Sequence, residues 1–257
     1  MSNPKIADWA GKRVWLVGAS SGIGAATAAA MLDRGARVAL SARSEAGLAR
    51  IAAGRGDDAL ALPLDVAAPE QLRAAWTRIR ESWGGADLVV YMAGTYTPLR
   101  AWEITPELAR ATIDTNLLGA MHAVSIVLPD MLARGEGAIA LTASVAGYRG
   151  LPKAALYGPS KAALINFAET LHLDLAPKGI SVYAINPGFV ATPLTAQNDF
   201  RMPALITSEE AARQILRGFA DGRFEIHFPR RFTLTMKVLE WLPYPLYFRI
   251  VRSMTGL

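Results

Sequence analysis

A tyrosine and a lysine four residues apart open a long helical stretch and could together move a proton. Tyr157 and Lys161 stand in the run Tyr-Gly-Pro-Ser-Lys. Positions i and i+4 share one face of a helix, so the ammonium would lie beside the phenol. A phenol titrates at about pH 10 in water, and a nearby cation favours the phenolate. The pair predicts a general acid/base with a pKa lowered toward neutral pH, although an ordinary helix start can have the same spacing.

A glycine-rich run near the start of the chain could bind phosphate groups. The run Gly-Ala-Ser-Ser-Gly-Ile-Gly at 18–24 follows the apolar segment Val14–Val17 and precedes an alanine-rich helical stretch. Glycines let a backbone approach a pyrophosphate, and a helix N-terminus offers free N–H groups and a positive dipole end. A tight strand–helix turn is the alternative. The context predicts a dinucleotide-binding loop formed by Gly18, Ser20, Ser21, Gly22, Ile23 and Gly24.

The end of the next apolar run indicates which nicotinamide cofactor this loop binds. An acidic residue there hydrogen-bonds the adenosine ribose and favours NAD. Here Arg37–Ser41 leads to Ala42 and Arg43, with no carboxylate. A planar guanidinium suits a 2′-phosphate. We therefore expect NADP(H) in preference to NAD(H), against the alternative of a solvated arginine that opens the next helix.

The elements that position these residues alternate along the chain. Alternation of this kind predicts an α/β fold, a Rossmann-type doubly wound parallel sheet of about seven strands with helices on both faces. Residues 1–229 are expected to form one catalytic domain, and residues 230–257 a C-terminal extension. The expected strands are Val14–Val17, Arg37–Ser41, Leu60–Leu64, Leu88–Tyr91, Ala138–Thr142 and Ser181–Ile185. The expected helices are Ile23–Arg34, Glu45–Ala53, Pro69–Trp83, Pro106–Arg134 and Tyr157–Pro177.

Further motifs occur in a fixed order with Tyr157 and Lys161. Ser144 follows the fifth strand, 13 residues before Tyr157, and Asn116 lies inside the long helix 106–134. The run Asn-Pro-Gly-Phe-Val-Ala-Thr at 186–192 follows the sixth strand. With the glycine loop, this set resembles the classical short-chain dehydrogenase/reductase family over about residues 10–225.

The resemblance implies a role for each matching residue. Tyr157 would be the general acid that protonates a carbonyl oxygen, and Lys161 would lower its pKa and hold the nicotinamide ribose. Ser144 would stabilise the charge that develops on the substrate oxygen. Asn116 would bind a water that relays protons from Lys161. The implied cofactor contacts are Asp65 at the adenine, Thr192 at the nicotinamide carboxamide, and Val66, Ala93, Gly94, Pro187, Gly188 and Val190 along the cofactor. Asp65 and Thr192 could instead cap the segments that follow them.

Two positions depart from the family pattern. The usual Asn-Asn-Ala-Gly after the fourth strand reads Tyr-Met-Ala-Gly at 91–94, and Val17 stands where Thr is common before the first glycine. The first Asn of the family ties neighbouring strands, so Tyr91 puts that support in question. Neither change removes a catalytic group, so we expect altered packing in an active enzyme.

The predicted function is the NADP(H)-dependent interconversion of a ketone or aldehyde with an alcohol. The loop after Thr192 offers Leu194, Phe200 and Met202, which favours an apolar substrate, although such residues also pack lids. The alternative is a catalytically silent nicotinamide-binding sensor or scaffold that docks through its tail. The helices 106–134 and 157–177 resemble family dimer helices and imply a homodimer or homotetramer.

The C-terminal extension mixes aromatic residues, leucines and arginines. It carries five basic residues and one acidic residue, Glu240, whereas the rest of the chain is nearly neutral. Such a composition suits peripheral contact with an anionic membrane surface. Packing over the active-site mouth or across a subunit interface is the alternative.

Composition excludes several other classes of protein. The 257 residues are 52% hydrophobic and 19% charged, which suits a folded domain, and with no cysteine there is no disulfide or thiolate chemistry. The histidines are not at ligand spacing, so we expect no metal, and no basic stripe indicates nucleic acid. No signal-peptide pattern opens the chain, and we expect a cytoplasmic protein.

Overall fold

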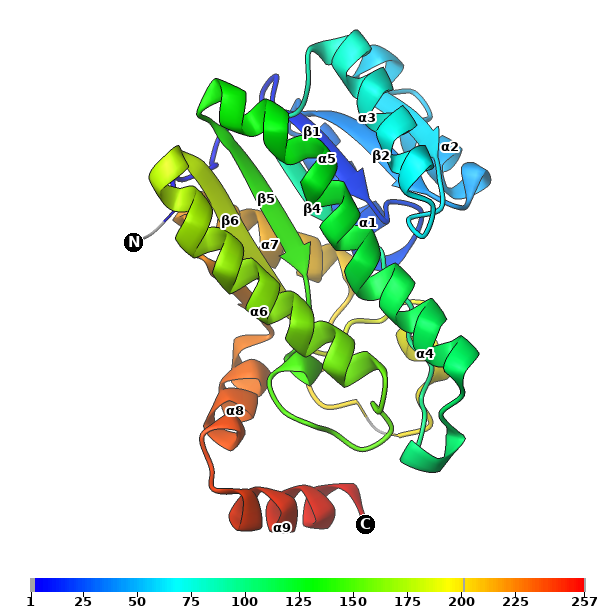
Figure 1. The fold of residues 1–257 in the computed structure, drawn as a ribbon, viewed down its shortest axis with the longest axis vertical. Coiled ribbons are helices and arrows are strands. Elements are labelled where there is room, and N and C mark those ends of the chain that lie inside the picture. Colours follow the sequence, from blue (N-terminus) through cyan, green and yellow to red (C-terminus); the bar gives the residue numbers. More distant parts are fainter. Residues whose placement is uncertain (1–2, 201, 257) are drawn as a thin grey trace.

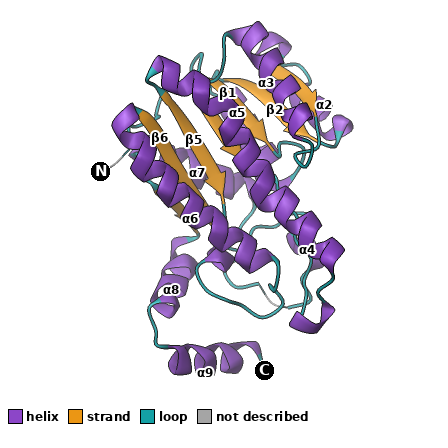
Figure 2. Cartoon of the chain, viewed as in Figure 1, coloured by secondary structure: helices purple, strands orange, loops and turns teal. Residues whose placement is uncertain are grey.

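The computed structural model describes residues 3–200 and 202–256 and is built around a seven-stranded parallel sheet (Figure 1, Figure 2). The strand order is β3-β2-β1-β4-β5-β6-β7, so the chain changes direction across the sheet between β1 and β4. Ligands of such sheets bind at this switch point, beyond the carboxyl ends of the strands. The strands are β1 (Arg13–Val17), β2 (Arg37–Ala42), β3 (Ala59–Pro63), β4 (Leu88–Tyr91), β5 (Gly137–Thr142), β6 (Ile180–Pro187) and β7 (Glu225–Phe228).

Helices cover both faces of the sheet. One hydrophobic core lies between the sheet and α3, α5 and α6, and a second lies between the sheet and α1, α2 and α7. The helices are α1 (Gly22–Leu32), α2 (Glu45–Ala52), α3 (Pro69–Trp83), α4 (Pro106–Ile113), α5 (Gly119–Arg134), α6 (Tyr157–Leu175), α7 (Ser208–Asp221), α8 (Arg230–Glu240) and α9 (Tyr244–Thr255). The doubly wound parallel fold expected from the sequence is confirmed.

The central strands are buried on both faces because helices cover them. All four residues of β4 and all eight residues of β6 are buried, which explains their nearly continuous apolar sequences. The β1 strand pairs in parallel with β2 and β4, with Val17 opposite Ser41 and Tyr91. These partners end at the same edge of the sheet, and the segments that follow them converge there.

The long helix expected over 106–134 is interrupted. The segment η3 (Asp114–Leu118) is a π-helical turn, in which the Gly119 N–H bonds the Asp114 carbonyl. Helix α6 ends at Leu175, before the short helix η5 (Ala176–Lys178). No bounds were expected for α7 or β7, which complete the sheet and its second face.

The C-terminal helices lie beyond the sheet, at the end of the molecule that holds the carboxyl ends of the strands (Figure 1). Along α8 the buried residues are Thr233, Met236 and Leu239, so one face of this helix meets the body. Met236 and Leu239 form a third hydrophobic cluster with Val145, Tyr247 and Val251. The extension therefore packs against the body of its own chain through part of α8 and α9.

One helical stretch, Pro106–Arg134, is long and apolar enough to cross a membrane by length and composition. Its α5 part lies across a face of the sheet (Figure 2), and Val124, Val127 and Met131 join the first core. Apolar core helices pass such a test as readily as membrane spans, and the position of α5 is that of a core helix.

Candidate active site

A cavity of about 500 Å³ opens at the carboxyl edge of the sheet. Segments that follow six of the strands supply its walls, from the glycine loop after β1 to residues 187–192 after β6. Every residue expected to bind cofactor or perform chemistry lines this cavity except Asn116. The structure therefore brings together residues that are up to 174 positions apart, between Gly18 and Thr192. Its size is in the range of small-molecule pockets.

The glycine loop fits a pyrophosphate. Gly18 has φ +101°, and a Cβ there would lie 2.5 Å from the backbone nitrogen of Ala93. Ser21 is the N-cap of α1, and its side chain makes no capping hydrogen bond. The first N–H groups of α1 therefore face the cavity without a side-chain cap, as a bound anion requires.

Ser144, Tyr157 and Lys161 meet in this cavity from two elements. Ser144 lies two residues after the end of β5. Its hydroxyl accepts from the Ala146 N–H at 3.1 Å and donates to the Pro187 carbonyl at 3.4 Å. Tyr157 and Lys161 come from the first turns of α6. The Lys161 Nζ lies 5.6 Å from the centroid of the Tyr157 ring.

Burial sets the protonation of the tyrosine and lysine. Burial raises the pKa of Tyr157 to about 12, and a hydrogen bond with Ser144 offsets only part of this effect. Burial also lowers the pKa of Lys161 to about 7, while its Nζ donates to the Thr142 carbonyl at 2.8 Å. The expectation that Lys161 brings the pKa of Tyr157 toward neutral is wrong for this structure, because desolvation is the largest influence on the phenol and only the bond with Ser144 opposes it. The phenol thus remains protonated at neutral pH.

Asn116 is fully buried and acts here as a tie between segments. Its Nδ2 donates to the Thr95 carbonyl at 3.0 Å and to the Ser160 hydroxyl at 2.9 Å. Its Oδ1 accepts from the Thr95 N–H at 2.7 Å. These bonds fix the segment after β4 against α6, one residue from Lys161. The expected water relay through Asn116 stays a prediction.

Tyr91, which stands where the family has Asn, makes a different tie. Its hydroxyl donates to the Thr115 carbonyl at 2.6 Å, inside the π turn that carries Asn116. The side chain is 1% exposed, and burial raises its pKa, so it stays a neutral donor. A Cβ on Gly119 would lie 2.3 Å from the Tyr91 hydroxyl, so a glycine there makes room for the larger side chain. Tyr91 therefore links β4 to the π turn.

Tyr96 is a neighbour of the reacting groups that the sequence analysis missed. Its ring meets the Tyr157 ring edge to face, with centroids 4.9 Å apart. Its hydroxyl donates to Asn198 Oδ1 at 2.9 Å, which connects it to the segment after Thr192. The available signal was its position two residues beyond Gly94, in a segment already assigned to the cavity.

Arg43, Asp65 and Thr192, the residues expected to contact the adenosine and nicotinamide ends of a cofactor, all line the cavity. Arg43 is exposed at the end of β2, lines the cavity, and forms no ion pair among residues 3–200 and 202–256. Asp65 lines the cavity and also accepts from the Ala67 N–H at 3.0 Å. Thr192 lines it too, and its hydroxyl accepts from the Thr195 N–H at 3.3 Å. Thr192 thus makes a local capping bond of the kind expected as its alternative, whereas the Asp65 side chain bonds within the turn before α3, whose N-cap is Ala68.

Comparison with known proteins agrees with this geometry. Residues 12–202 match the family model described as short chain dehydrogenase. The chain belongs to the short-chain dehydrogenase/reductase family. It is an oxidoreductase of the nicotinamide-dependent kind that this family contains.

Individual members of the short-chain dehydrogenase/reductase family are similar over most of the chain. An uncharacterized oxidoreductase of Myxococcus xanthus is 35% identical over 94% of this chain and 97% of its own. A 3-oxoacyl-[acyl-carrier-protein] reductase, FabG, of Vibrio cholerae is 32% identical over 79% of this chain and 84% of its own. A short-chain dehydrogenase from Sphingobium yanoikuyae in complex with NADPH is 27% identical, with a TM-score of 0.78 over 88% of this chain and 93% of its own.

Proposed function

We propose that the chain is an NADP(H)-dependent reductase that interconverts a ketone or aldehyde with an alcohol on an apolar substrate. The observation that carries the proposal is the convergence of Ser144, Tyr157 and Lys161 in a cavity that also holds the glycine loop. Residues 1–229 would be the catalytic domain and residues 230–257 its extension. A location in the cytoplasm stays a prediction.

The side chains of the cavity would divide the reaction among them. The bound nicotinamide supplies or accepts the hydride. Ser144 would donate a hydrogen bond to the substrate oxygen, and Tyr157 would give that oxygen its proton. A phenol that burial keeps protonated suits the direction of reduction. Lys161 would hold the ribose and replace the proton that Tyr157 gives up.

Tyr157→Phe tests the proton-transfer role. We expect NADPH affinity to persist while turnover falls by about 10²–10⁴-fold. The matched control is Tyr244→Phe, on the exposed side of α9. The readout is NADPH oxidation at 340 nm. Turnover equal to that of the unchanged protein would remove Tyr157 from the mechanism. Tight NADPH binding without turnover on any carbonyl compound would favour the sensor alternative.

Arg43 supports the preference for NADP(H). A charged hydrogen bond to a phosphate is worth about 1.5–3 kcal/mol, so Arg43→Ala should weaken NADPH binding about 10- to 100-fold. NADH binding should hardly change. Arg34→Ala is the control, because Arg34 is exposed and, within the described residues, its guanidinium bonds only the Ala30 carbonyl of its own helix. Equal losses for NADPH and NADH would refute the assignment.

A chain-like carbonyl substrate is the class to test first. Leu194 lines the cavity, and the Phe189 ring contacts Phe200 and Phe232 with centroids 5.8 and 5.3 Å apart. Two relatives bear the names 3-oxoacyl-[acyl-carrier-protein] reductase and ketoacyl reductase. With 3-oxoacyl thioesters of rising length, kcat/KM should increase about fourfold for each methylene that is buried, at about 0.8 kcal/mol each. Independence of chain length would argue against an apolar pocket.

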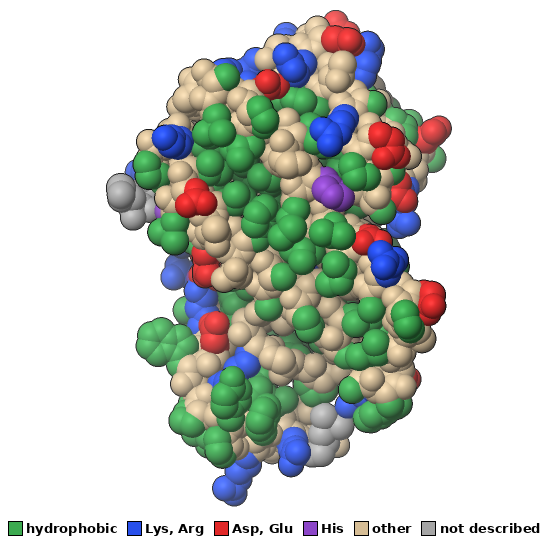
Figure 3. Space-filling view, in the orientation of Figure 1, with side chains coloured by type: hydrophobic (Ala, Val, Ile, Leu, Met, Phe, Trp, Pro, Cys, Tyr) green, Lys and Arg blue, Asp and Glu red, His purple; other side chains and the backbone are tan. Residues whose placement is uncertain are grey.

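A homodimer or homotetramer is proposed on the face formed by α5 and α6. Hydrophobic side chains gather there in the space-filling view (Figure 3), and Leu132 and Leu173 are 43% and 75% exposed. Light scattering of the purified protein tests this. A monomer at all concentrations would refute it, and Leu173→Lys should weaken the assembly.

Peripheral contact with an anionic lipid surface is proposed for α9. Only Tyr247 and Val251 of this helix are buried, whereas Tyr244, Phe248 and Met254 are 68%, 53% and 67% exposed. The helix carries two arginines and no acid. Aromatic side chains with arginines suit a negatively charged interface. Co-sedimentation with phosphatidylglycerol vesicles should fall for Phe248→Ser but not for Trp102→Ser, at a still more exposed aromatic residue elsewhere. Equal binding of both variants would refute it.

A further inference from the structure

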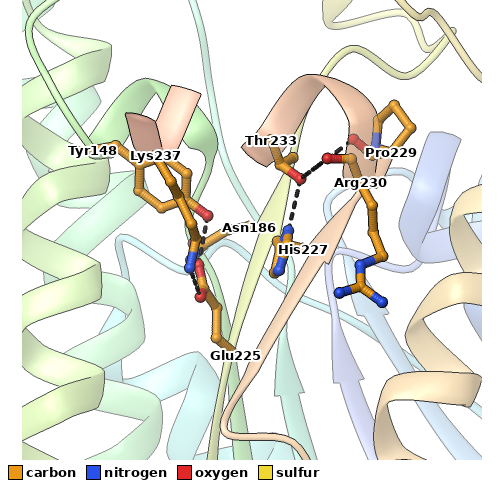
Figure 4. Close-up of polar contacts among 8 residues, drawn as sticks. All are labelled: Tyr148, Asn186, Glu225, His227, Pro229, Arg230, Thr233 and Lys237. Carbon is orange, nitrogen blue, oxygen red and sulfur yellow. Dashed lines mark hydrogen bonds and ion pairs between the residues drawn. The ribbon is translucent and has the colours of Figure 1, made fainter. Parts of the chain in front are cut away.

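Glu225, at the start of β7, is a carboxylate shared by side chains from three other segments (Figure 4). Its Oε1 accepts from Asn186 Nδ2 at 2.8 Å and from the Tyr148 hydroxyl, and its Oε2 accepts from Lys237 Nζ. The Glu225 side chain is 22% exposed. Burial acts to raise the pKa of Glu225, but the bonds from Lys237, Tyr148 and Asn186 together hold that pKa below its usual value. Glu225 is therefore an ionised acceptor at neutral pH.

Two of the donors belong to segments that carry active-site groups. Tyr148 follows Ser144 by four residues, at the end of the short helix η4 (Val145–Gly147), and Asn186 directly precedes Pro187. The same two segments touch where the Ser144 hydroxyl meets the Pro187 carbonyl. Glu225 thus joins them a second time, behind the cavity wall. Movement of either segment would strain both contacts.

The third donor comes from the C-terminal extension. Lys237 lies on α8, and the Thr233 hydroxyl of the same helix lies 2.6 Å from His227 Nδ1 of β7 (Figure 4). Phe232 packs against the segment after Asn186, since a Cβ on Gly188 would lie 2.8 Å from its ring. Helix α8 is therefore docked to the cavity wall by both polar and apolar contacts.

Arg149 connects the segment after Ser144 to the end of α8 and to α9. Its guanidinium lies 4.1 Å from the Tyr247 ring centroid, and the Tyr247 hydroxyl donates to the Gly150 carbonyl at 2.6 Å. Its Nη1 donates to carbonyl oxygens at the end of α8 and in the turn after it, those of Leu239, Glu240 and Leu242. Residues 144–151 are thus held by the extension at both ends.

We propose that Glu225 and Lys237 are positioning residues for the reduction, through which α8 holds Ser144 and the Pro187 segment in register. Neither side chain lines the cavity, so both act through Tyr148 and Asn186. Because Ser144 and Pro187 act in the proposed reduction, this role rests on the proposed function. The glycine loop and Arg43 make none of these contacts, so the network should affect kcat more than cofactor affinity, to which the segment from Pro187 to Val190 is also expected to contribute.

Lys237→Met tests the role by removing the cation and keeping an unbranched side chain. Misplacement of a reacting group by about 1 Å can lower kcat about 100-fold, and we expect a loss of about 10- to 100-fold in kcat with a smaller change in the KM for NADPH. The assay uses NADPH and a 3-oxoacyl thioester, with kcat expressed per NADPH-binding site. Lys178→Met, at an exposed lysine with no ion pair in the described part of the chain, is the matched control. A kcat within about twofold of the unchanged protein would overturn the proposal.

Two further variants separate positioning from a general loss of folding. Lys237→Arg keeps the cation and should restore most of kcat. Glu225→Gln should lower kcat to a similar extent, and the double variant should lose no more than either single one if the pair acts as a unit. Additive losses, or no rescue by arginine, would contradict a shared role.

Amide hydrogen exchange tests the positioning contacts even if no substrate that the enzyme turns over is found. In Lys237→Met, exchange should become about tenfold faster in residues 145–151 and 187–190, while that of β1 and α1 should not change. If the unchanged protein reduces no carbonyl compound, the proposed function fails, but this local increase would still support the positioning contacts. Unchanged exchange in both segments, or an equal increase throughout the chain, would overturn them.

Discussion

Replacing Lys161 with methionine should stabilise the cofactor-free protein while it removes turnover. Lys161 is 3% exposed, and its Nζ donates to a backbone carbonyl, that of Thr142. Burial lowers its pKa from 10.5 to about 7. In the unfolded chain the ammonium is hydrated again, and its pKa returns to its ordinary value. Methionine has a similar length and no charge to desolvate. The folded protein with methionine at this position should therefore have a higher free energy of unfolding than the protein with Lys161.

The sign and size of this effect follow from proton linkage. Between about pH 7 and pH 10.5 the unfolded chain holds a proton that the folded protein has released, so the free energy of unfolding rises with pH in this window. At about 1.4 kcal/mol for each pH unit once the folded protein has released the proton, Lys161 alone should raise it by roughly 2 kcal/mol from pH 7 to pH 9. Below pH 7 the full penalty remains, roughly 5 kcal/mol if no water relaxes the site. Lys161→Met should lack this dependence.

Urea unfolding of both proteins at several pH values measures the effect. Because other titrating groups cancel, the difference in unfolding free energy between Lys161→Met and the unchanged protein should shrink from pH 7 to pH 9. Loss of the bond to Thr142 shifts this difference by a constant and leaves its slope intact. Lys178→Met, at an exposed position, should give a flat difference. A flat difference for Lys161→Met would refute the reasoning, because it would mean that Lys161 keeps its ordinary pKa.

Three further outcomes are expected. The kcat/KM for reduction should fall in two steps, near pH 7 as Lys161 loses its proton and again in strongly alkaline solution as Tyr157 does, since burial places their pKa values at about 7 and about 12; a level profile through pH 7 would argue against Lys161 as the source of the proton. Gly18→Ala should lower the free energy of unfolding by about 2–4 kcal/mol and abolish NADPH binding, because the new Cβ would lie 2.5 Å from the Ala93 nitrogen. Calorimetry measures the first effect and a binding titration the second. An unchanged melting point would contradict the contact. Arg13 lowers the pKa of Asp87 despite burial, so the pair stabilises the fold above the ordinary pKa of 3.8 and less as pH falls below it. Asp87→Asn should therefore lower the free energy of unfolding by about 1–3 kcal/mol at pH 7 and by little in acid. A loss that does not depend on pH would argue against the ion pair.

The cavity was predictable from sequence because of a property of parallel sheets. Every strand of such a sheet ends at the same edge, so motifs that follow strands must meet, however far apart they stand in the chain. This places the glycine loop, Arg43, Ser144 and the Pro187 segment together without any structural information. Tyr157 and Lys161 needed only helical spacing to share a face.

The contacts of Glu225, Lys237 and Tyr91 behind the cavity could not be predicted from the sequence in the same way. Glu225 and Lys237 belong to elements with no motif, and their pairing depends on how α8 docks, which periodicity does not specify. Tyr91 looked like a loss because the family pattern has a smaller amide there. Its hydroxyl bonds the Thr115 carbonyl, which lies in the π turn. Neither the π turn nor the pKa of Lys161 has a signature in residue type.

The π turn at Asp114–Leu118 also sets a limit on length changes in this region. The π turn contains one residue more than the same turn of a regular α-helix, so α5 is rotated about the helix axis by roughly 100° relative to α4. Deleting any single residue here would permit an unbroken α-helix. The residues on one side of the deletion would then have to rotate about the helix axis by that angle. Either Asn116 would rotate, or the whole of α4 would rotate together with the loop that carries Tyr96. A homologue one residue shorter at this point should therefore have a differently built entrance, whereas point substitutions in the same turn can leave the phase intact.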